Sequence, residues 1–312
     1  MINYVVYGST MIDKIRLTSG EVISELLGGG GPQGAFGARV WDRSVGILTR
    51  SGTDLPDKSR KTLESLGVDL TGWKQYSGHQ TPMAFMSYDE NQRMLTGIEI
   101  KQLMRKTHST MHELISEKLP IPEIYYAPRV IHLITGDPDE TIAHEALNMK
   151  ANGSIYSLEP IMGYRGWDNI SQIVSYLSNV DLVVPDWLSA SRVAGSEDPL
   201  NVLRYWSQTG VQAVAIRNGV QGSYVWDRET DHMWHIPIVT VETIDPTGCG
   251  NSYAGGFCVG WDQHRDSRIA GCYGTISASF LAKIVGVEGV TPQIEREAHR
   301  LLDRHLNKVK SM

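Results

Sequence analysis

The chain reads Asp245-Pro246-Thr247-Gly248-Cys249-Gly250-Asn251 between an extended run at residues 235–244 and a run of small residues at 252–256. This order predicts that the glycines lie where a strand turns into a helix. The first turn of a helix has unpaired backbone N–H groups, and the helix dipole adds positive charge there. The segment therefore predicts an anion-binding turn, with a phosphate as the expected guest. A glycine-rich turn that binds nothing is the alternative that the local sequence leaves open.

Segments with strand and helix patterns alternate through most of the chain. Apolar or alternating runs predict strands at 2–7, 45–50, 130–134, 153–158, 181–184, 213–217, 223–226 and 234–241. Helical periodicity predicts helices at 55–66, 139–151, 198–209 and 266–284, with a further helix toward the C-terminus. Such alternation favours one α/β domain spanning residues 1–312, with a doubly wound, mostly parallel sheet flanked by helices.

Local chemistry marks two helix ends and one region outside this rhythm. Gly67 has the position of a left-handed C-cap, and Thr291 has that of an N-cap before a first-turn proline. Residues 81–97 resemble a hairpin that pairs with residues near 15–27, so we expect a small β lid from elements near 14–27 and 72–100. Residues 99–129 fit no part of the α/β pattern and are interpreted as an insertion.

The composition is that of a soluble, folded protein. It is 41% hydrophobic and 21% charged, and the formal net charge of -6 provides no basic face for nucleic acid. No apolar run is long enough to span a membrane and no signal peptide opens the chain, so we expect no membrane partner and a cytoplasmic location. The cysteines at 249, 258 and 272 lack metal-type spacing, which favours buried thiols in a reducing compartment.

The glycine segment is similar to the C-terminal signature of the ribokinase-like (pfkB) carbohydrate kinases, which commonly reads D-T-x-G-A-G-D. The resemblance implies that Gly248, Cys249 and Gly250 form an anion hole for the transferring phosphoryl group. It places Asp245 near the metal and phosphates. It also places Asn251 where the family has the aspartate that accepts the proton of the substrate hydroxyl.

Other segments extend this resemblance over nearly the whole chain. Asp13 follows a segment similar to the family's first strand and takes the place of its substrate-hydroxyl-binding aspartate. Residues 28–35 resemble the G-G-x-x-x-N-x-A element, so Gly29, Gly30 and Gln33 are expected to bind the acceptor, with Gln33 in place of an asparagine. The resemblance implies a small-molecule substrate, and because lids in this family often pair between subunits it also suggests a homodimer through the lid.

The second half of the chain resembles the family's nucleotide side. Residues 182–186 are similar to the strand before its N-x-x-E motif, residues 213–222 to the strand and turn that reach the phosphates, and residues 278–289 to the helix and loop beside the adenine. The resemblance implies ATP and Mg²⁺ as cofactors. It assigns nucleotide-binding roles to Asp186, Arg217, Asn218, Gly219, Gly222 and Ser279.

The chain departs from the family's pattern at three positions that carry chemistry. The amide of Asn251 has no lone pair basic enough to take a proton near neutral pH, which would cost about two to four orders of magnitude in rate. The N-x-x-E motif ends at Ser189 without its acid, for which Asp186 could compensate, so no metal ligand is assigned with certainty. Arg217 replaces a small hydroxyl residue, where it would contact phosphate or pair with a nearby carboxylate.

Three hypotheses for the function follow. The chain is a divergent kinase that transfers phosphate from ATP to a small-molecule acceptor, either a sugar-like hydroxyl or an acidic nucleophile that needs little deprotonation. Alternatively, it is an enzyme repurposed for another reaction in the same pocket, or a ligand-binding pseudo-kinase. The retained Asp13, Asp245 and glycine elements favour a functional, ligand-binding pocket over one that has lost its function.

Readings outside the family are weaker. Residues 29–34 match G-x-G-x-x-G with Asp54 about twenty residues on, as in a dinucleotide-binding dehydrogenase, but Pro32 interrupts the turn and the run does not directly follow the first strand. A G-x-S-x-G nucleophile elbow is absent. His108 and His112 have helical spacing but lack the acid of an H-E-x-x-H zinc helix.

Overall fold

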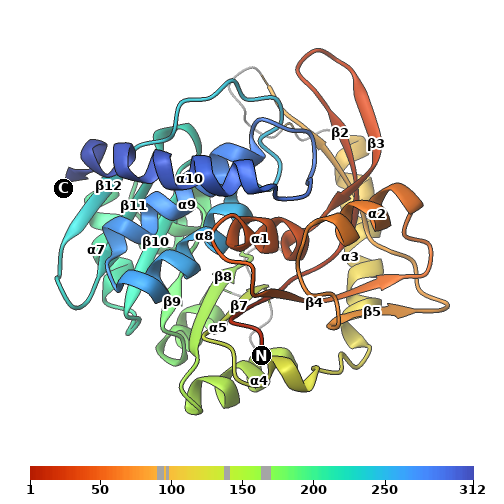
Figure 1. The fold of residues 1–312 in the computed structure, drawn as a ribbon, viewed down its shortest axis with the longest axis horizontal. Coiled ribbons are helices and arrows are strands. Elements are labelled where there is room, and N and C mark those ends of the chain that lie inside the picture. Colours follow the sequence, from red (N-terminus) through yellow and green to blue (C-terminus); the bar gives the residue numbers. More distant parts are fainter. Residues whose placement is uncertain (90–94, 96–97, 137–140, 163–169) are drawn as a thin grey trace.

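The structure, a computed structural model, describes the whole chain except residues 90–94, 96–97, 137–140 and 163–169. Its centre is a sheet of ten described strands with helices on both faces (Figure 1). The strands, in their order across the sheet, are β13 (Lys310–Ser311), β12 (Met233–Ile236), β11 (Ser223–Asp227), β10 (Ala213–Arg217), β9 (Leu182–Val183), β8 (Ile155–Pro160), β7 (Val130–Thr135), β1 (Tyr4–Tyr7), β4 (Val45–Gly52) and β5 (Trp73–Tyr76). Neighbours from β10 to β5 are parallel, and those from β10 to β13 are antiparallel.

Two hydrophobic clusters fill the space between this sheet and its helices. Alternate residues of a strand face opposite sides, so Tyr4 and Val6 belong to one cluster, whereas Val5 and Tyr7 belong to the other. The first cluster packs the sheet against α1 (Gly30–Arg39), α2 (Asp57–Ser65), α8 (Cys249–His264), α9 (Ser267–Leu281) and α10 (Pro292–His305). The second packs it against α4 (Thr141–Ala151), α5 (Ile170–Tyr176), α6 (Trp187–Ala194) and α7 (Pro199–Ser207).

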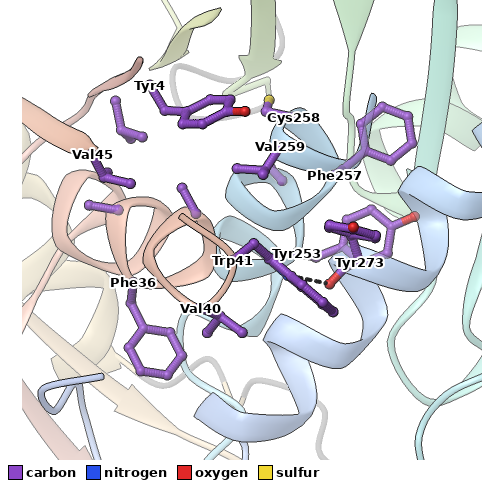
Figure 2. Close-up of a cluster of buried hydrophobic side chains, with 14 of the residues drawn as sticks. Tyr4, Phe36, Val40, Trp41, Val45, Tyr253, Phe257, Cys258, Val259 and Tyr273 are labelled. Atoms are coloured by element: carbon purple, nitrogen blue, oxygen red, sulfur yellow. Dashed lines mark hydrogen bonds between the residues drawn. The ribbon is translucent and has the colours of Figure 1, made fainter. Parts of the chain in front are cut away.

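Helices α1, α8 and α9 pack unusually closely, and this packing fixes the start of α8 (Figure 2). A Cβ atom on Gly37 would overlap the carbonyl oxygen of Ser252, and one on Gly255 would overlap that of Gly34, so the backbones of α1 and α8 touch. Trp41 stacks on the ring of Tyr273 with centroids 3.9 Å apart. The two helices that begin with the glycine-rich elements are therefore held against each other without intervening side chains.

A second, smaller sheet contains the described strands β3 (Val22–Gly28), β2 (Met11–Arg16) and β6 (Met83–Ser87), with β2 in the middle. β2 pairs antiparallel with β3 and parallel with β6, so the predicted contact between the segments near 15–27 and 81–97 is confirmed. The tip of the predicted hairpin lies outside the described residues. Within residues 99–129, the structure has helix α3 (Ile98–Ser116), which packs on β6 and β4. Its interpretation as an insertion stays a prediction.

The predicted α/β class, strands and helices are confirmed at the level of elements. Gly67 has φ +75° after α2, and the hydroxyl of Thr291 accepts a hydrogen bond from the backbone N–H of Ile294 at 3.3 Å, as the cap patterns predicted. Short 3₁₀ turns lie at Glu123–Tyr125, Leu177–Asn179, Gly219–Gln221 and Leu306–Lys308. None of the described helices combines the length and apolar character needed to cross a bilayer.

Candidate functional site

The predicted helix start lies at the beginning of α8, but the strand expected directly before it is absent, because β12 ends at Ile236 and residues 237–248 form an irregular loop. Gly248 is the N-cap with φ +78°, a left-handed conformation that favours glycine, and Cys249 begins the helix. In the described part of the chain, the backbone N–H groups of Gly248, Gly250 and Asn251 have no hydrogen-bond partner. These residues are partly exposed. The turn can therefore bind an anion through these donors and the positive end of the helix.

Asp245 stabilises this turn through hydrogen bonds that backbone N–H groups donate to its side chain. Its buried carboxylate accepts hydrogen bonds from the backbone N–H of Thr247 at 2.9 Å and from that of Gly286 at 3.1 Å. The first contact closes the turn, and the second ties it to the loop after α9. Cys249 lies beside it, where burial, with a smaller contribution from the charge of Asp245, raises the pKa of its thiol to about 12. The thiol is therefore protonated at neutral pH and donates to the carbonyl oxygen of Ala278 at 3.5 Å.

The two amide residues that are predicted to depart from the family pattern, Asn251 and Gln33, contact each other. Nδ2 of Asn251 donates to Oε1 of Gln33 at 2.7 Å. The side chain of Gln33 also covers the Cα of Gly248, because a Cβ atom there would overlap Cδ of Gln33. Gly29, the N-cap of α1 with φ +92°, and Gly30, its first residue, place Gln33 in the first turn of that helix. The structure thus brings together the expected acceptor and phosphate elements.

Asp13 lies on β2 and is buried, with 2% of its surface exposed. Its carboxylate packs on the Cα of Gly28, where a Cβ atom would overlap it. Among the described residues, Oδ1 of Asp13 has no hydrogen-bond partner. Burial raises the pKa of Asp13 to about 7, and the nearby charge of Asp245 adds to the shift. A buried carboxylate with a free oxygen is suited to accept a hydrogen bond from a ligand hydroxyl.

Tyr88, which the sequence analysis missed, connects the lid to the turn. The hydroxyl of Thr247 donates to the Tyr88 hydroxyl at 3.1 Å, and burial raises the pKa of Tyr88. A cavity of about 210 Å³ lies next to this contact and is lined by Tyr88, Asp245 and the lid segment at residues 15–18, among others. The only signal in the sequence was the position of Tyr88 in the predicted lid hairpin.

Apart from Arg217, the residues predicted to bind the nucleotide make hydrogen bonds within their own helices and turns. Asp186 caps α6, with Oδ1 accepting from the backbone N–H of Ser189 at 2.9 Å and Oδ2 from its hydroxyl at 2.6 Å. Ser189, predicted to replace the family's glutamate, therefore uses both oxygens of the neighbouring aspartate. The hydroxyl of Ser279 donates to the carbonyl oxygen of Ile276 within α9 at 2.8 Å. Between β10 and β11, the chain turns through Asn218, Gly219 and Gly222, closed by a backbone hydrogen bond from Asn218 to Gly222 at 2.7 Å.

Arg217 pairs with a carboxylate, one of the two alternatives considered for it, and its contact with phosphate stays a prediction. Its Nη1 forms an ion pair with Oε1 of Glu159 at 2.6 Å. The same atom would lie 2.5 Å from a Cβ atom on Gly250, so the guanidinium also touches the first turn of α8. Glu159 and the buried His132 beside it were missed by the sequence analysis, although a charged residue inside an otherwise apolar strand is a usable signal.

The residues present fit phosphate groups better than a bare metal ion. No cluster of three or more His, Cys, Asp or Glu side chains within the described part of the chain is arranged to hold a metal. Mg²⁺ commonly binds through one or two carboxylates together with waters and substrate phosphates, so it does not need such a cluster. Unpaired N–H groups, a helix N-terminus and Arg217 in one place are the donors that a polyphosphate requires.

The model of the pfkB family carbohydrate kinases matches residues 1–293. The chain belongs to the pfkB family. Its resemblance to these kinases, inferred from the glycine turn, is therefore confirmed, and a pfkB chain is a kinase that transfers phosphate from ATP to a small-molecule acceptor. The comparisons give no support to the pseudo-kinase alternative.

Curated relatives and solved structures agree with this assignment. The pfkB chain is 27% identical over 266 residues to a cytidine kinase of Thermococcus kodakarensis, with 85% of this chain and 90% of the relative covered. It is 23% identical over 285 residues to a nucleoside kinase of Methanothermobacter thermautotrophicus, covering 91% and 84%. The structure of adenosine kinase from Sinorhizobium meliloti superposes with a TM-score of 0.77 at 16% identity, covering 96% of this chain and 99% of that one. That likeness confirms the ribokinase-like fold.

Proposed function

We propose that this pfkB chain phosphorylates a hydroxyl group of a ribose-containing acceptor, most simply a nucleoside, with ATP and Mg²⁺. One observation carries the proposal: the unpaired N–H groups at the start of α8 and the buried Asp13, whose Oδ1 has no partner among the described residues, both lie near Asp245 and Tyr88. The names of the cytidine and nucleoside kinases among its relatives support a nucleoside as the acceptor.

The turn at residues 248–251 binds the phosphate in the proposed reaction. The backbone N–H groups of Gly248, Gly250 and Asn251 bind the oxygens of the transferring phosphoryl group, and the dipole of α8 favours its negative charge. Arg217 adds a fixed positive charge beside Gly250. Mg²⁺, when bound with the nucleotide near Asp245, would supply charge neutralisation for the leaving group.

The acceptor side falls to Asp13, with Gly29, Gly30 and Gln33. Asp13 accepts a hydrogen bond from an acceptor hydroxyl, and Gln33 holds Asn251 at the reacting position. Asn251 orients the attacking hydroxyl through Oδ1 rather than deprotonating it. The new O–P bond forms as the bond from the γ-phosphorus to the bridging oxygen breaks, ADP leaves, and the proton of the hydroxyl passes to the transferred phosphate or to water. A loose transition state allows the reaction to proceed in this order without a general base, but more slowly than with one.

The remaining predicted residues complete the proposed nucleotide site. The turn formed by Asn218, Gly219 and Gly222 would cover the phosphates, and Ser279 with its helix would border the adenine. Asp186 contributes by capping α6 at the same edge of the sheet. The arrangement as one α/β domain with a lid, and a homodimer through that lid, are part of the same proposal.

The test is turnover with a panel of nucleosides and free pentoses, in which mass spectrometry detects the phosphorylated product. Because an amide stands at the position of the catalytic base, we expect a slow kcat of about 10⁻³ to 10⁻¹ s⁻¹. This value is about two to four orders of magnitude below the kcat of an ordinary enzyme. Addition of ATP and Mg²⁺ should also raise the melting temperature by a few degrees. A melting shift without any phosphorylated product would contradict the proposal.

A further inference from the structure

Glu159 and Arg217 meet across the end of a short strand. Glu159 lies on β8 and Arg217 ends β10, while β9 between them has only two residues and pairs with both neighbours at Leu182 and Val183. The two side chains therefore project beyond the end of β9 at the carboxyl edge of the parallel strands. This edge is where open α/β sheets bind their ligands.

The position of this ion pair is electrostatically expensive. The side chains of Arg217 and Glu159 are only 12% and 6% exposed, so both charges are largely removed from water. In addition, the guanidinium touches Gly250 in the first turn of α8, where the helix dipole disfavours a cation. Fold stability alone does not account for an arginine here. A phosphate bound at the turn would be stabilised by the helix and the guanidinium together.

The contacts of the pair leave donors for such a ligand. Nη1 of Arg217 binds Glu159, and Nε is 3.5 Å from the carbonyl oxygen of Pro185. Across the described residues, Nη2 has no hydrogen-bond partner. Burial raises the pKa of Glu159, but Arg217 and the adjacent His132 outweigh it and lower the pKa overall. Glu159 is therefore ionised at neutral pH and can hold the guanidinium firmly.

Glu159 has further buried neighbours, although among the described residues its Oε2 makes no hydrogen bond. His132 on β7 lies with Nε2 3.7 Å from Oε2 of Glu159. Its other ring nitrogen shares a hydrogen bond of 3.0 Å with the hydroxyl of Ser157, which also accepts from the thiol of Cys258 on α8 at 3.2 Å. This network links Glu159 to the same helix whose first turn Arg217 contacts.

We propose that Glu159 is a positioning residue for phosphoryl transfer: by holding Nη1 of Arg217, it fixes the guanidinium against Gly250 so that its remaining N–H groups contact the γ-phosphate of ATP. The proposal rests on the kinase function proposed above. This contact would strengthen the binding of ATP and not that of ADP, because only ATP carries the phosphate that Arg217 contacts.

The experiment is calorimetric titration of the full chain with MgATP and, separately, MgADP, for the wild type and Glu159→Gln. We expect Glu159→Gln to weaken MgATP binding about 10- to 100-fold, the loss associated with charge-assisted hydrogen bonds, and to change MgADP binding less than about threefold. Glu159→Asp keeps the charge and should retain part of the preference for ATP.

The matched control is Glu295→Gln. Glu295 also forms a 2.6 Å ion pair with a largely buried arginine, Arg39 at the end of α1, away from the turn. We expect this variant to lose thermal stability but to keep the wild-type ratio of ATP to ADP affinity. If folded Glu159→Gln, confirmed by circular dichroism, keeps that ratio as well, the positioning role is overturned. If the wild type itself fails to bind MgATP, the kinase proposal fails instead.

Discussion

Asn251 and Gln33, the two amide residues predicted to depart from the family's pattern, form a hydrogen bond with each other. Asn251 is the residue predicted to take the place of the family's catalytic carboxylate. An aspartate at position 251 could keep the contact, because the amide of Gln33 can rotate to present its N–H₂ group. The local geometry therefore tolerates the family residue, and the amide is a chemical change rather than a steric one.

Replacing Asn251 with Asp tests this change directly. We expect kcat for phosphorylation of the acceptor to rise by about two to four orders of magnitude, because the carboxylate can accept the hydroxyl proton. Asn307→Asp, an exposed site near the C-terminus, is the control and should leave kcat unchanged. A fall in kcat on Asn251→Asp would mean that the amide is required for the native reaction.

Asp13 predicts a pH-dependent stability. Its pKa is raised to about 7 in the folded chain, whereas an unfolded aspartate titrates near 3.8. Between these values the folded state holds a proton that the unfolded state has released, so the contribution of Asp13 to the unfolding free energy falls as pH rises from about 4 to 7. Above pH 7, the full cost of a buried charge is present.

Asp13→Asn removes that cost. At pH 8 we expect its unfolding free energy to exceed the wild-type value by on the order of 2 to 4 kcal/mol, with little difference near pH 4. Phosphorylation of the acceptor should fall, because the amide is a weaker acceptor than a carboxylate. Urea denaturation at both pH values measures the first effect. An equal change in stability at pH 4 and pH 8 would rule out the raised pKa as its cause.

At the scale of elements, the start of α8 depends on a glycine that a side chain cannot replace. Gly248 has φ +78°, and a Cβ atom there would overlap Gln33. Gly195, the C-cap of α6, is also left-handed with φ +64°, but no atom lies within 4 Å of the position of its Cβ. The two positions share the backbone strain and differ in what surrounds them.

We expect Gly248→Ala and Gly195→Ala each to cost about 1 kcal/mol of stability from the left-handed backbone. Only Gly248→Ala should also displace Gln33 and the turn, and so lower kcat/KM more than about tenfold. Thermal unfolding and turnover of both variants check this expectation. Equal losses of activity in the two variants would show that the turn tolerates a side chain.

Elements buried on both faces were the most predictable part of this fold. β7 and β8 are buried along their whole length because helices cover both sides of the sheet, and their apolar residues were enough for sequence pattern to locate them. Helix α3 was missed, since its Met, His and Lys residues gave no clear apolar face or capping residues. The glycine turn was predicted because its conformation demands particular residues, which is a local property.

Contacts between distant segments were beyond the sequence. Glu159 and Arg217 are 58 residues apart, and their pairing depends on β9 being short and lying between β8 and β10. Tyr88 and Thr247 are 159 residues apart and meet only because the lid lies over the loop before α8. Neither sequence periodicity nor residue propensity predicts such side-chain contacts, because they depend on the order of the strands and on the placement of the lid.

At the scale of the whole molecule, the lid strands stand beside the large sheet, and the two parts bring different groups to the site (Figure 1). The lid contributes Asp13 and Tyr88, and the sheet with its helices contributes Asp245, the turn at residues 248–251 and Arg217. The proposed binding of acceptor and nucleotide would therefore use groups from both parts of the chain. This division is suited to a kinase, which must exclude water while the phosphoryl group moves.

The most direct measurement is a crystal structure of the chain with Mg²⁺ and a non-hydrolysable ATP analogue. We expect γ-phosphate oxygens at about 3 Å from the backbone nitrogens of Gly250 and Asn251, with the guanidinium of Arg217 on the same phosphate. A nucleotide whose phosphates lie elsewhere, with these N–H groups bound to water or to protein, would contradict this expectation.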